Sequence, residues 1–417
     1  MGQQCPQSDR TGANATGESL IAAVKILTFS SLFPNSRQAS HGIFVENRLR
    51  QLLAYAPELR ANVIAPVPWF PSSNPRFGSY AEFAGIASHE VRHGIDVWHP
   101  RYPVIPKVGM QITPWLMYRS VRGAVKRLRD RGFDFDLIDA HYFYPDGVAA
   151  MWLAEDFDRP FVVTGRGTDL NLIPQYPGPR KKIMRVAQKA AHMMTVAGAL
   201  KAYLLDLGVA DERVTVLRNG VDLTFFHPAE NIATLRESLG FSKKPTLLSV
   251  GHLIERKGHH LVIEAMRNLP GMDLVVAGDG PEQASLHQLV DRWALHDRVS
   301  FAGRLTQDSL REHYQAADAL ILASSREGWA NVLLESMACG TPVVATPVDG
   351  TPEVVASAAA GQLTANRSTD AIVSAAEALF AQLPDRAATR RYAEGFSWDD
   401  TSRGQLEIFQ RAIVAKS

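Results

Sequence analysis

Short apolar runs alternate with longer amphipathic stretches along most of the chain. Runs rich in Val, Ile and Leu predict strands at 25–29, 62–66, 136–141, 161–164 and 193–196, and a second series at 246–250, 273–277, 299–302, 319–323 and 343–345. Continuous apolar runs are typical of parallel strands that are covered on both faces. Because stretches of helical periodicity separate them, the pattern predicts βαβ units and an α/β fold with open, doubly wound parallel sheets.

The two series of strands indicate two Rossmann-like domains. We expect the first at 23–216 and the second at 217–399, because Asn219-Gly220 marks a turn and Pro228 ends the segment between the two series. The polar residues 1–22 predict a solvated tail. A last helix is expected from about Asp400 to Ala415, within 400–417.

The composition excludes several classes of protein. With 46% hydrophobic and 21% charged residues among 417, the chain is neither disordered nor fibrous. Its two cysteines, Cys5 and Cys339, exclude a disulfide framework and favour a reducing compartment. No apolar run approaches the ~20 residues that span a bilayer, and the first residues lack the apolar segment of a secretory signal. We therefore expect a cytoplasmic protein.

The net charge of +1 conceals an asymmetry between the two halves of the chain. Residues 1–216 hold 25 Lys and Arg against 19 Asp and Glu, which gives +6, and residues 217–417 hold 19 against 24, which gives −5. The positive charge gathers on two predicted helices, the first of which has an apolar stripe that includes Trp115. The basic residues are Arg119, Arg122, Lys126, Arg127, Arg129 and Arg131, then Arg180, Lys181, Lys182, Arg185 and Lys189. They form either solvated helix faces or a surface for anionic membrane lipid or a phosphorylated acceptor; no nucleic-acid partner is expected.

Two glutamates follow the predicted strand at 319–323. Glu327 lies in the loop after it, and Glu335 lies about one turn inside a helix expected to begin near Asn331. A helix N-terminus offers unpaired N–H groups and a partial positive charge, which together bind phosphate. A carboxylate one turn further along can accept hydrogen bonds from a pair of sugar hydroxyls. This strand–loop–helix context therefore predicts a site for a phosphorylated sugar compound.

A basic loop follows the predicted strand at 246–250. Gly251 permits a close approach of the backbone, and Lys257 supplies a point charge suited to a diphosphate. Basic loops of this kind are common, so the loop alone indicates little. A third element, the turn at 278–282, is expected to be structural.

These elements, in this order and spacing, resemble the C-terminal domain of the retaining glycosyltransferases of family four, which have the GT-B fold. That fold has two Rossmann-like domains that face a cleft, and a C-terminal helix that crosses back to the N-terminal domain. The resemblance covers about residues 24 to 417. The matching motifs are Glu327 and Glu335 for E-x₇-E, Lys257-Gly258, Gly278 to Glu282, Asn219-Gly220-Val221-Asp222, Asp139-Ala140-His141, Gly42, Gly167-Thr168-Asp169, and Phe396-Ser397-Trp398 before the crossing helix.

The resemblance implies roles for several of these residues. Lys257 would bind the donor diphosphate together with backbone amides near Asn331 and Val332, and Glu335 would hold the ribose hydroxyls. The reacting sugar would face Glu327, with His141 contacting it from the opposite domain. Gly42 would let the first loop approach the diphosphate, and Gly251, His252 and Arg256 belong to the donor loop. No Asp-x-Asp motif for a metal accompanies this set, so we expect no cofactor and a metal-independent reaction in which fixed charges stabilise the leaving group.

Two residues depart from the family pattern. His252 stands where the family usually has arginine, so either Arg256 compensates or the diphosphate is held with one permanent charge fewer. The residue before Gly167 is usually histidine and here is Arg166. The guanidinium of Arg166 could meet an anionic group of the donor or acceptor, with Asp169 nearby, or it could form a structural ion pair with Asp169.

Residues 89–93 match the zinc-protease pattern H-E-x-x-H, with His89 and His93 as ligands and His99 where a third could lie. That motif needs a helix to bring both imidazoles to one face, whereas Gly94 and the alternating apolar residues around it predict a strand and a turn. We therefore expect no metal here.

The sequence thus predicts a cytoplasmic, retaining glycosyltransferase. It would either be free in the cytoplasm or bind peripherally to the cytoplasmic face of the membrane. It would move a sugar from a nucleotide-sugar donor to a glycan or lipid-linked acceptor in polysaccharide or cell-surface glycan biosynthesis. Three alternatives stay open: a GT-B nucleotide-sugar epimerase, an inactive nucleotide-sugar-binding partner, and a zinc protease.

Overall fold

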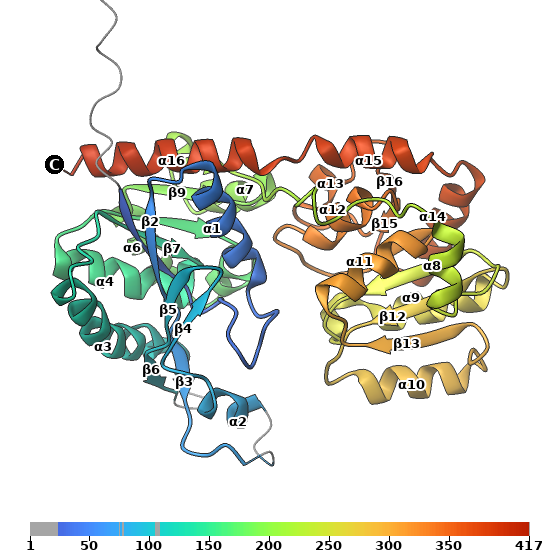
Figure 1. Ribbon diagram of the computed structural model, residues 1–417, viewed down its shortest axis with the longest axis horizontal. Helices are drawn as coiled ribbons and strands as arrows, with labels where there is room; N and C mark the ends of the chain where they lie inside the picture. Colours follow the sequence, from blue (N-terminus) through green and yellow to red (C-terminus); the bar gives the residue numbers. More distant parts are fainter. Residues whose placement is uncertain (1–23, 75, 77–78, 105–108, 417) are drawn as a thin grey trace, which may run out of the picture.

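The computed structural model describes residues 24–74, 76, 79–104 and 109–416. Two parallel-rich sheets dominate it, one in each half of the chain, and helices cover both faces of each (Figure 1). A separate pair of short strands, β3 (Val67–Trp69) and β6 (Arg101–Pro103), extends from the first half. The predicted tail at 1–22 lies outside the described residues.

The sheet of the first half has eight strands, and all pairs but one are parallel. In spatial order they are β10 (Val214–Val216), β9 (His192–Thr195), β8 (Phe161–Gly165), β7 (Leu137–His141), β1 (Lys25–Phe29), β2 (Arg60–Ile64), β5 (Ile95–Trp98) and β4 (His89–Arg92). The middle strands are buried throughout, as their uninterrupted apolar sequences require. Only β4 runs antiparallel, at the edge of the sheet.

The sheet of the second half has six parallel strands. In spatial order they are β13 (Val299–Gly303), β12 (Asp273–Ala277), β11 (Thr246–Val250), β14 (Ala319–Leu322), β15 (Val343–Ala345) and β16 (Gly361–Leu363). The order reverses at β11, where chain neighbours lie on one side and β14 on the other. Ligands of open α/β sheets bind beyond the carboxyl ends of strands at such a point.

Helices connect the strands in both halves. The first half has α1 (Ile43–Tyr55), α2 (Ser79–Ala84), α3 (Gly109–Asp130), α4 (Val148–Phe157), α5 (Thr168–Asn171), α6 (Pro177–Lys189) and α7 (Gly198–Asp206). The second has α8 (Ile232–Ser238), α9 (His259–Ala265), α10 (Gln283–Arg292), α11 (Gln307–Ala316), α12 (Asn331–Ala338), α13 (Thr351–Val354), α14 (Thr369–Ala381), α15 (Arg386–Glu394) and α16 (Trp398–Val414). No helix in the described ranges combines the length and apolarity that a bilayer crossing needs.

The last helix returns to the first half of the molecule, as the GT-B resemblance implied. In Figure 1, α15 lies along the second half and α16 continues along the first, next to α1. Ile408 and Phe409 of α16 are buried in one cluster with Leu49 and Leu52 of α1. Ser397 caps the helix by accepting a hydrogen bond from the backbone N–H of Asp399, so α16 begins slightly before the expected 400. The domain limits 23–216 and 217–399 stay predictions. The expected boundary between residues 216 and 217 lies directly after β10.

The apolar stripe predicted for residues 115–128 lies on helix α3 and is buried in part. Met117, Val121 and Val125 are fully buried, four residues apart, as the helical period requires. The expectation that Trp115 packs with them is wrong, because its side chain is 52% exposed. A helix turns by about 100° per residue, so Trp115 lies off the buried stripe.

Candidate functional site

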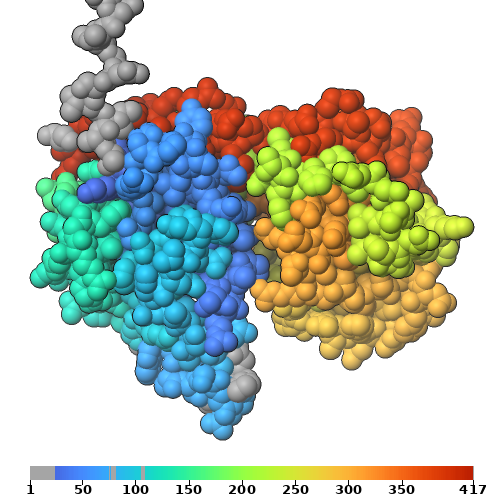
Figure 2. Space-filling view, in the orientation of Figure 1, coloured from blue at the N-terminus to red at the C-terminus, as the bar shows by residue number. Residues whose placement is uncertain are grey.

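A cavity of about 490 Å³ lies between the two halves, beyond the carboxyl ends of strands from both sheets. Figure 2 shows the groove that separates the halves. The loops after β1, β7 and β8 form one wall, and the loops after β11 and β14 with the start of α12 form the other. The cavity brings together Arg166, Arg256, Lys257, Glu327, Asn331, Val332 and Glu335 of the predicted site.

Lys257 and Glu327 form the charged centre of the second wall. Lys257 Nζ lies 2.5 Å from Glu327 Oε1, and the Ser324 hydroxyl donates to the same oxygen at 2.6 Å. The backbone N–H of Glu327 donates to Asp349 Oδ2 at 2.9 Å, which holds the loop. Burial acts to raise the pKa of Glu327, but Lys257 and Ser324 outweigh it and hold that pKa below its usual range. Glu327 is therefore an ionised carboxylate beside a fixed cation.

The second glutamate has the opposite electrostatic environment. Glu335 lies one turn inside α12, which begins at Asn331 as predicted. Its Oε2 accepts a hydrogen bond from the Tyr314 hydroxyl at 3.0 Å. No cation pairs with it among the described residues, and burial raises its pKa to about 7. A carboxyl with this pKa changes charge near neutral pH.

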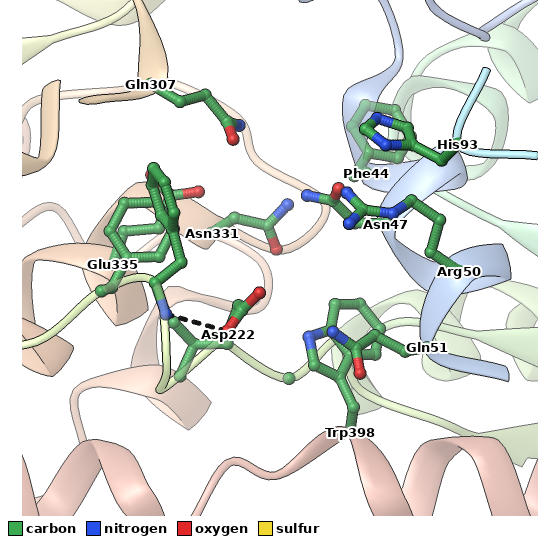
Figure 3. Close-up of a pocket in the computed structure, with 14 residues that line it drawn as sticks. Phe44, Asn47, Arg50, Gln51, His93, Asp222, Gln307, Asn331, Glu335 and Trp398 are labelled. Carbon is green, nitrogen blue, oxygen red and sulfur yellow. Dashed lines mark hydrogen bonds between the residues drawn. The ribbon is translucent and has the colours of Figure 1, made fainter. Parts of the chain in front are cut away.

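A second hollow of about 280 Å³ continues from the cavity, and both are lined by Phe44, Gln307, Asn331 and Glu335. Figure 3 shows side chains of α1, including Asn47 and Arg50, on one side and Asn331 with Glu335 on the other. Trp398, the first residue of α16, lies at one end. The space available to an extended ligand therefore runs past Glu335 along the junction of the two halves.

The first wall is a buried polar network rather than a row of free groups. His141 is 1% exposed and does not line the cavity. Its Nδ1 accepts a hydrogen bond from Arg166 Nη2 at 2.6 Å, so Nε2 carries the proton and donates to Asp139 Oδ2 at 3.1 Å. Burial lowers the pKa of His141 to about 4, against the opposing influence of Asp139. The imidazole is neutral, and the predicted contact between His141 and the sugar stays a prediction.

The guanidinium of Arg166 occupies the position between His141 and the cavity. Asp169 does not pair with that guanidinium. Its oxygens instead accept backbone N–H groups of Phe143, Arg166 and Gly167 at 2.8 to 3.0 Å. Asp169 is fully buried and fixes the loop after β8, so a direct contact between Asp169 and substrate has no support in this geometry.

The chain matches two models of protein families. Glycosyltransferase Family 4 matches residues 81–225, and Glycosyl transferases group 1 matches residues 231–396. A glycosyltransferase of Bacillus subtilis (strain 168) named for teichuronic acid biosynthesis is 30% identical over 334 residues, which is 78% of this chain and 82% of that protein. The D-inositol 3-phosphate glycosyltransferase of Mycolicibacterium paratuberculosis is 31% identical over 301 residues, 67% of each protein.

The chain belongs to the group 1 glycosyltransferases. Solved structures agree on the fold. Sucrose-phosphate synthase of Thermosynechococcus elongatus superposes with a TM-score of 0.73 at 19% identity, over 94% of this chain and all of that one. HepE of Anabaena, in complex with UDP and glucose, superposes with a TM-score of 0.70 at 21% identity, over 92% and 98%. The GT-B fold inferred from the motifs is confirmed.

Within this glycosyltransferase, three predicted donor residues do not line the cavity. Gly42 has φ +66°, and a Cβ there would lie 2.3 Å from the carbonyl carbon of Leu32, so the glycine is required by the packing of its own loop. Gly251 lies against the side chain of Lys257, since a Cβ on Gly251 would be 3.5 Å from Lys257 Cδ. The imidazole of His252 is 3.8 Å from Asp279 and largely exposed. Arg256 does line the cavity, and its Nη1 donates to the carbonyl of Arg326 at 2.9 Å.

The first wall also includes Arg48 and Gln405, which sequence reasoning missed, and Asn219, which the sequence indicated only as part of a family motif. Arg48, Asn219 and Gln405 join the network of the first wall: Arg48 donates to Gln405 Oε1 at 2.8 Å and to Asn219 Oδ1 at 3.3 Å. Asn219 donates in turn to Asn331 Oδ1 at 3.2 Å. A buried polar residue in an amphipathic helix was the available signal for Arg48, but no motif connects it with α16.

The H-E-x-x-H segment of this glycosyltransferase lies on β4 and the following turn, as expected. His89 pairs with Asp96 at 2.7 Å, and His99 pairs with Glu90 at 2.8 Å and with the Ala65 carbonyl. In the part of the chain that the structure describes, no three His, Cys, Asp or Glu side chains gather as a metal site. The zinc-protease alternative therefore loses its structural basis, while metal independence of the transfer stays a prediction.

Proposed function

We propose that the protein is a retaining, metal-independent glycosyltransferase that moves a sugar from a nucleotide-sugar donor to a glycan or lipid-linked acceptor. One observation carries the proposal: Lys257, Glu327, Glu335 and the start of α12 converge on one interdomain cavity. The α12 N-terminus and the cations of the same wall suit a diphosphate. The carboxylate of Glu335 suits the hydroxyls of a ribose.

In the proposed reaction the bond between the anomeric carbon and the diphosphate oxygen breaks, and the electron pair stays on that oxygen. Lys257, Arg256 and the amides near Asn331 and Val332 stabilise the developing charge without requiring a metal ion. An acceptor hydroxyl attacks the anomeric carbon from the same face and passes its proton to the departing phosphate oxygen. Glu327 stabilises the positive charge that builds up on the sugar. A covalent intermediate on Glu327 is the alternative route to retention.

We further propose that the acceptor lies at the cytoplasmic membrane surface and that the protein serves glycan biosynthesis. The name of the Bacillus subtilis relative assigns that protein to teichuronic acid biosynthesis. Met110, Ile112 and Trp115 of α3 and Tyr176 before α6 are exposed. Helix α3 runs toward the start of β7 and α6 follows β8, so both begin at the carboxyl edge of the sheet. The cavity is at the same edge, where Tyr142 and Arg166 line it. Exposed apolar and aromatic side chains next to Arg and Lys suit an anionic bilayer surface.

A thermal-shift screen tests the donor proposal. The purified protein is heated with UDP, GDP, ADP and their common sugar conjugates, with and without EDTA. A nucleotide at 100 times its dissociation constant should add about 2.7 kcal/mol to the free energy of unfolding. We expect one diphosphate to raise the melting temperature regardless of EDTA. No shift with any nucleotide would contradict the proposal, and a shift abolished by EDTA would contradict metal independence.

Product analysis then separates transfer from the two remaining alternatives. A nucleotide-sugar epimerase would release free sugar, and an inactive partner would bind the donor without consuming it. A transferase gives a glycosylated acceptor of retained anomeric configuration, read from the anomeric coupling constant by NMR. Inversion would contradict retention while leaving transfer intact.

Vesicle sedimentation tests the membrane surface. We expect binding to vesicles of phosphatidylcholine with anionic phosphatidylglycerol, weaker at high salt and several-fold weaker in a Trp115→Ser variant. Tyr55→Ser is the matched control. Tyr55 is an exposed aromatic residue like Trp115, but it is the last residue of α1 and lies at the amino edge of the sheet, away from the proposed membrane surface. Equal sedimentation of both variants and the wild type would contradict the assignment.

A further inference from the structure

Arg166 presents a positively charged group to the cavity from the first wall. The residue is only 8% exposed and lines the cavity opposite Lys257 and Glu327. Its Nη2 donates to His141 and its Nη1 donates to Asn219 Oδ1 at 3.3 Å, while its Nε has no hydrogen-bond partner among the described residues. Each terminal nitrogen therefore uses only one of its two N–H groups in these bonds.

No carboxylate in the described part of the chain bonds to this guanidinium. Two buried carboxylates act on it through charge alone: Asp139 Oδ2 accepts from His141 and from Gln405 Nε2, and Asp169 accepts backbone amides. Asp139 Oδ1 has no hydrogen-bond partner among the described residues. A second buried guanidinium, that of Arg48, shares Asn219 as its acceptor. Burial and the charge of Arg48 lower the pKa of Arg166 more than Asp139 and Asp169 raise it, so the desolvation cost of this cation is only partly compensated. An anion that accepts its remaining N–H groups would offset part of that cost.

The position of Arg166 relative to the reacting centre narrows the choice of anion. Its backbone carbonyl packs directly against Gly328, the neighbour of Glu327: a Cβ on Gly328 would lie 1.7 Å from the Arg166 oxygen. Asn219 links Arg166 to Asn331 at the start of α12. The cations suited to the diphosphate, Lys257 and Arg256, come from the opposite wall. Arg166 therefore faces the space between the diphosphate site and Glu327, where the transferred sugar would lie.

We propose that Arg166 is a specificity-determining residue that binds a carboxylate on the transferred sugar, so that the preferred donor is a nucleotide-linked uronic acid. This inference rests on the proposed function. The planar fork of a guanidinium matches a carboxylate through two parallel hydrogen bonds, which a neutral hydroxymethyl group cannot form. His141 and Asn219 act as positioning residues that hold the fork in place.

Donor binding by calorimetry tests the inference. The wild type, Arg166→Gln and Arg166→Lys are titrated with UDP, UDP-glucose and UDP-glucuronic acid, and in parallel with GDP, GDP-mannose and GDP-mannuronic acid. We expect the wild type to bind the acidic conjugate about 10- to 100-fold more tightly than the neutral one, the range for charge-assisted hydrogen bonds. In Arg166→Gln the two should bind equally, with the affinity for the free diphosphate within twofold of the wild type.

The lysine variant and a control sharpen the result. Arg166→Lys keeps the charge without the fork and should retain a reduced preference. Arg185→Gln, an exposed arginine of α6 outside the cavity, should behave as the wild type. Thermal melts test whether each variant is folded. If Arg166→Gln does not fold, the relative affinities of Arg166→Lys for the acidic and neutral conjugates are compared with those of the wild type instead.

Each contrary outcome has a distinct meaning. Equal affinity of the wild type for acidic and neutral conjugates would overturn the inference while leaving the proposed function intact. So would an Arg166→Gln variant that loses affinity for the free diphosphate, because Arg166 would then contact phosphate. Failure of every diphosphate and conjugate to bind the wild type would instead contradict the proposed function itself.

Discussion

The two walls of the cleft are built in different ways. The second wall draws most of its groups from one continuous segment, Ser324 to Glu335, and adds Lys257 from a single further loop. The first wall assembles its network from α1, β7, the loop after β8, the interdomain linker and α16. The hydrogen bond between Arg48 and Gln405 joins residues 357 positions apart.

This difference separates chemistry from positioning. Ionised Glu327, titratable Glu335 and Lys257 all line the cavity of the second wall, where they can act on a ligand. In the first wall most polar groups bond to one another, and of the network only Arg166 and Asn219 also line the cavity. Substitutions in the first wall should therefore act chiefly on stability and geometry, and substitutions in the second chiefly on the reaction.

The largest effect should come from Arg48 in the first wall. Arg48→Ala removes the donor to Gln405, to Asn219 and to the carbonyl of Leu217. Buried Gln405 Oε1 loses its charged partner, and Asn219 Oδ1 keeps only the bond from Arg166. Breaking such a network costs about 3–5 kcal/mol in the free energy of unfolding. Urea denaturation measures the change. Arg50→Ala is the control, two residues along the same helix and exposed, with an expected change within about 0.5 kcal/mol. Equal stability of the two variants would remove the distinction between the walls.

The next largest effect should come from Lys257 in the second wall. Lys257→Ala removes the cation that faces Glu327 at 2.5 Å and, in the proposed reaction, the leaving diphosphate. Loss of one such group lowers kcat by about 10²–10³-fold. Initial rates at saturating donor measure it, with Lys243→Ala, an exposed lysine far from the cavity lining, as the control. A variant with normal kcat would exclude Lys257 from the reaction.

The same contrast explains how much the sequence could predict. The strands at 25–29, 246–250, 273–277 and 343–345 lie where the apolar runs place them, because buried parallel strands carry an uninterrupted signal. The predicted strand at 62–66 lies at 60–64, and the short edge strands β10 and β16 were not predicted, since three residues carry little pattern.

The residues of the candidate site likewise fall into those that local sequence spacing predicts and those that it does not. Glu327, Asn331 and Glu335 were predictable because one loop and one helix fix their relative positions. The burial of His141 behind Arg166, and the participation of Gln405, depend on contacts between distant segments, which local spacing does not encode.

The smallest expected effect is on the affinity for the nucleoside diphosphate and depends on the charge of Glu335. It distinguishes the role of Glu335 from that of Glu327. Burial raises the pKa of Glu335 to about 7, so the fraction of ionised carboxylate increases as the pH rises through that value. An ionised carboxylate accepts hydrogen bonds from two ribose hydroxyls more strongly than a neutral acid does. The affinity for the nucleoside diphosphate should therefore increase between pH 6 and pH 8. Glu335→Gln should bind about tenfold more weakly at pH 8 and show no such rise, since one lost hydrogen bond to a charged group costs at least that much.

Calorimetric titration at pH 6, 7 and 8 measures this dependence. Glu377→Gln, an exposed residue of α14, should keep the wild-type profile. Because Glu327 is already ionised beside Lys257, its pKa lies below this window, and Glu327→Gln should lower kcat while leaving the rise in affinity unchanged. A Glu335→Gln variant with the wild-type pH profile would show that the titrating group lies elsewhere, and the division of labour between the two glutamates of the second wall would then be wrong.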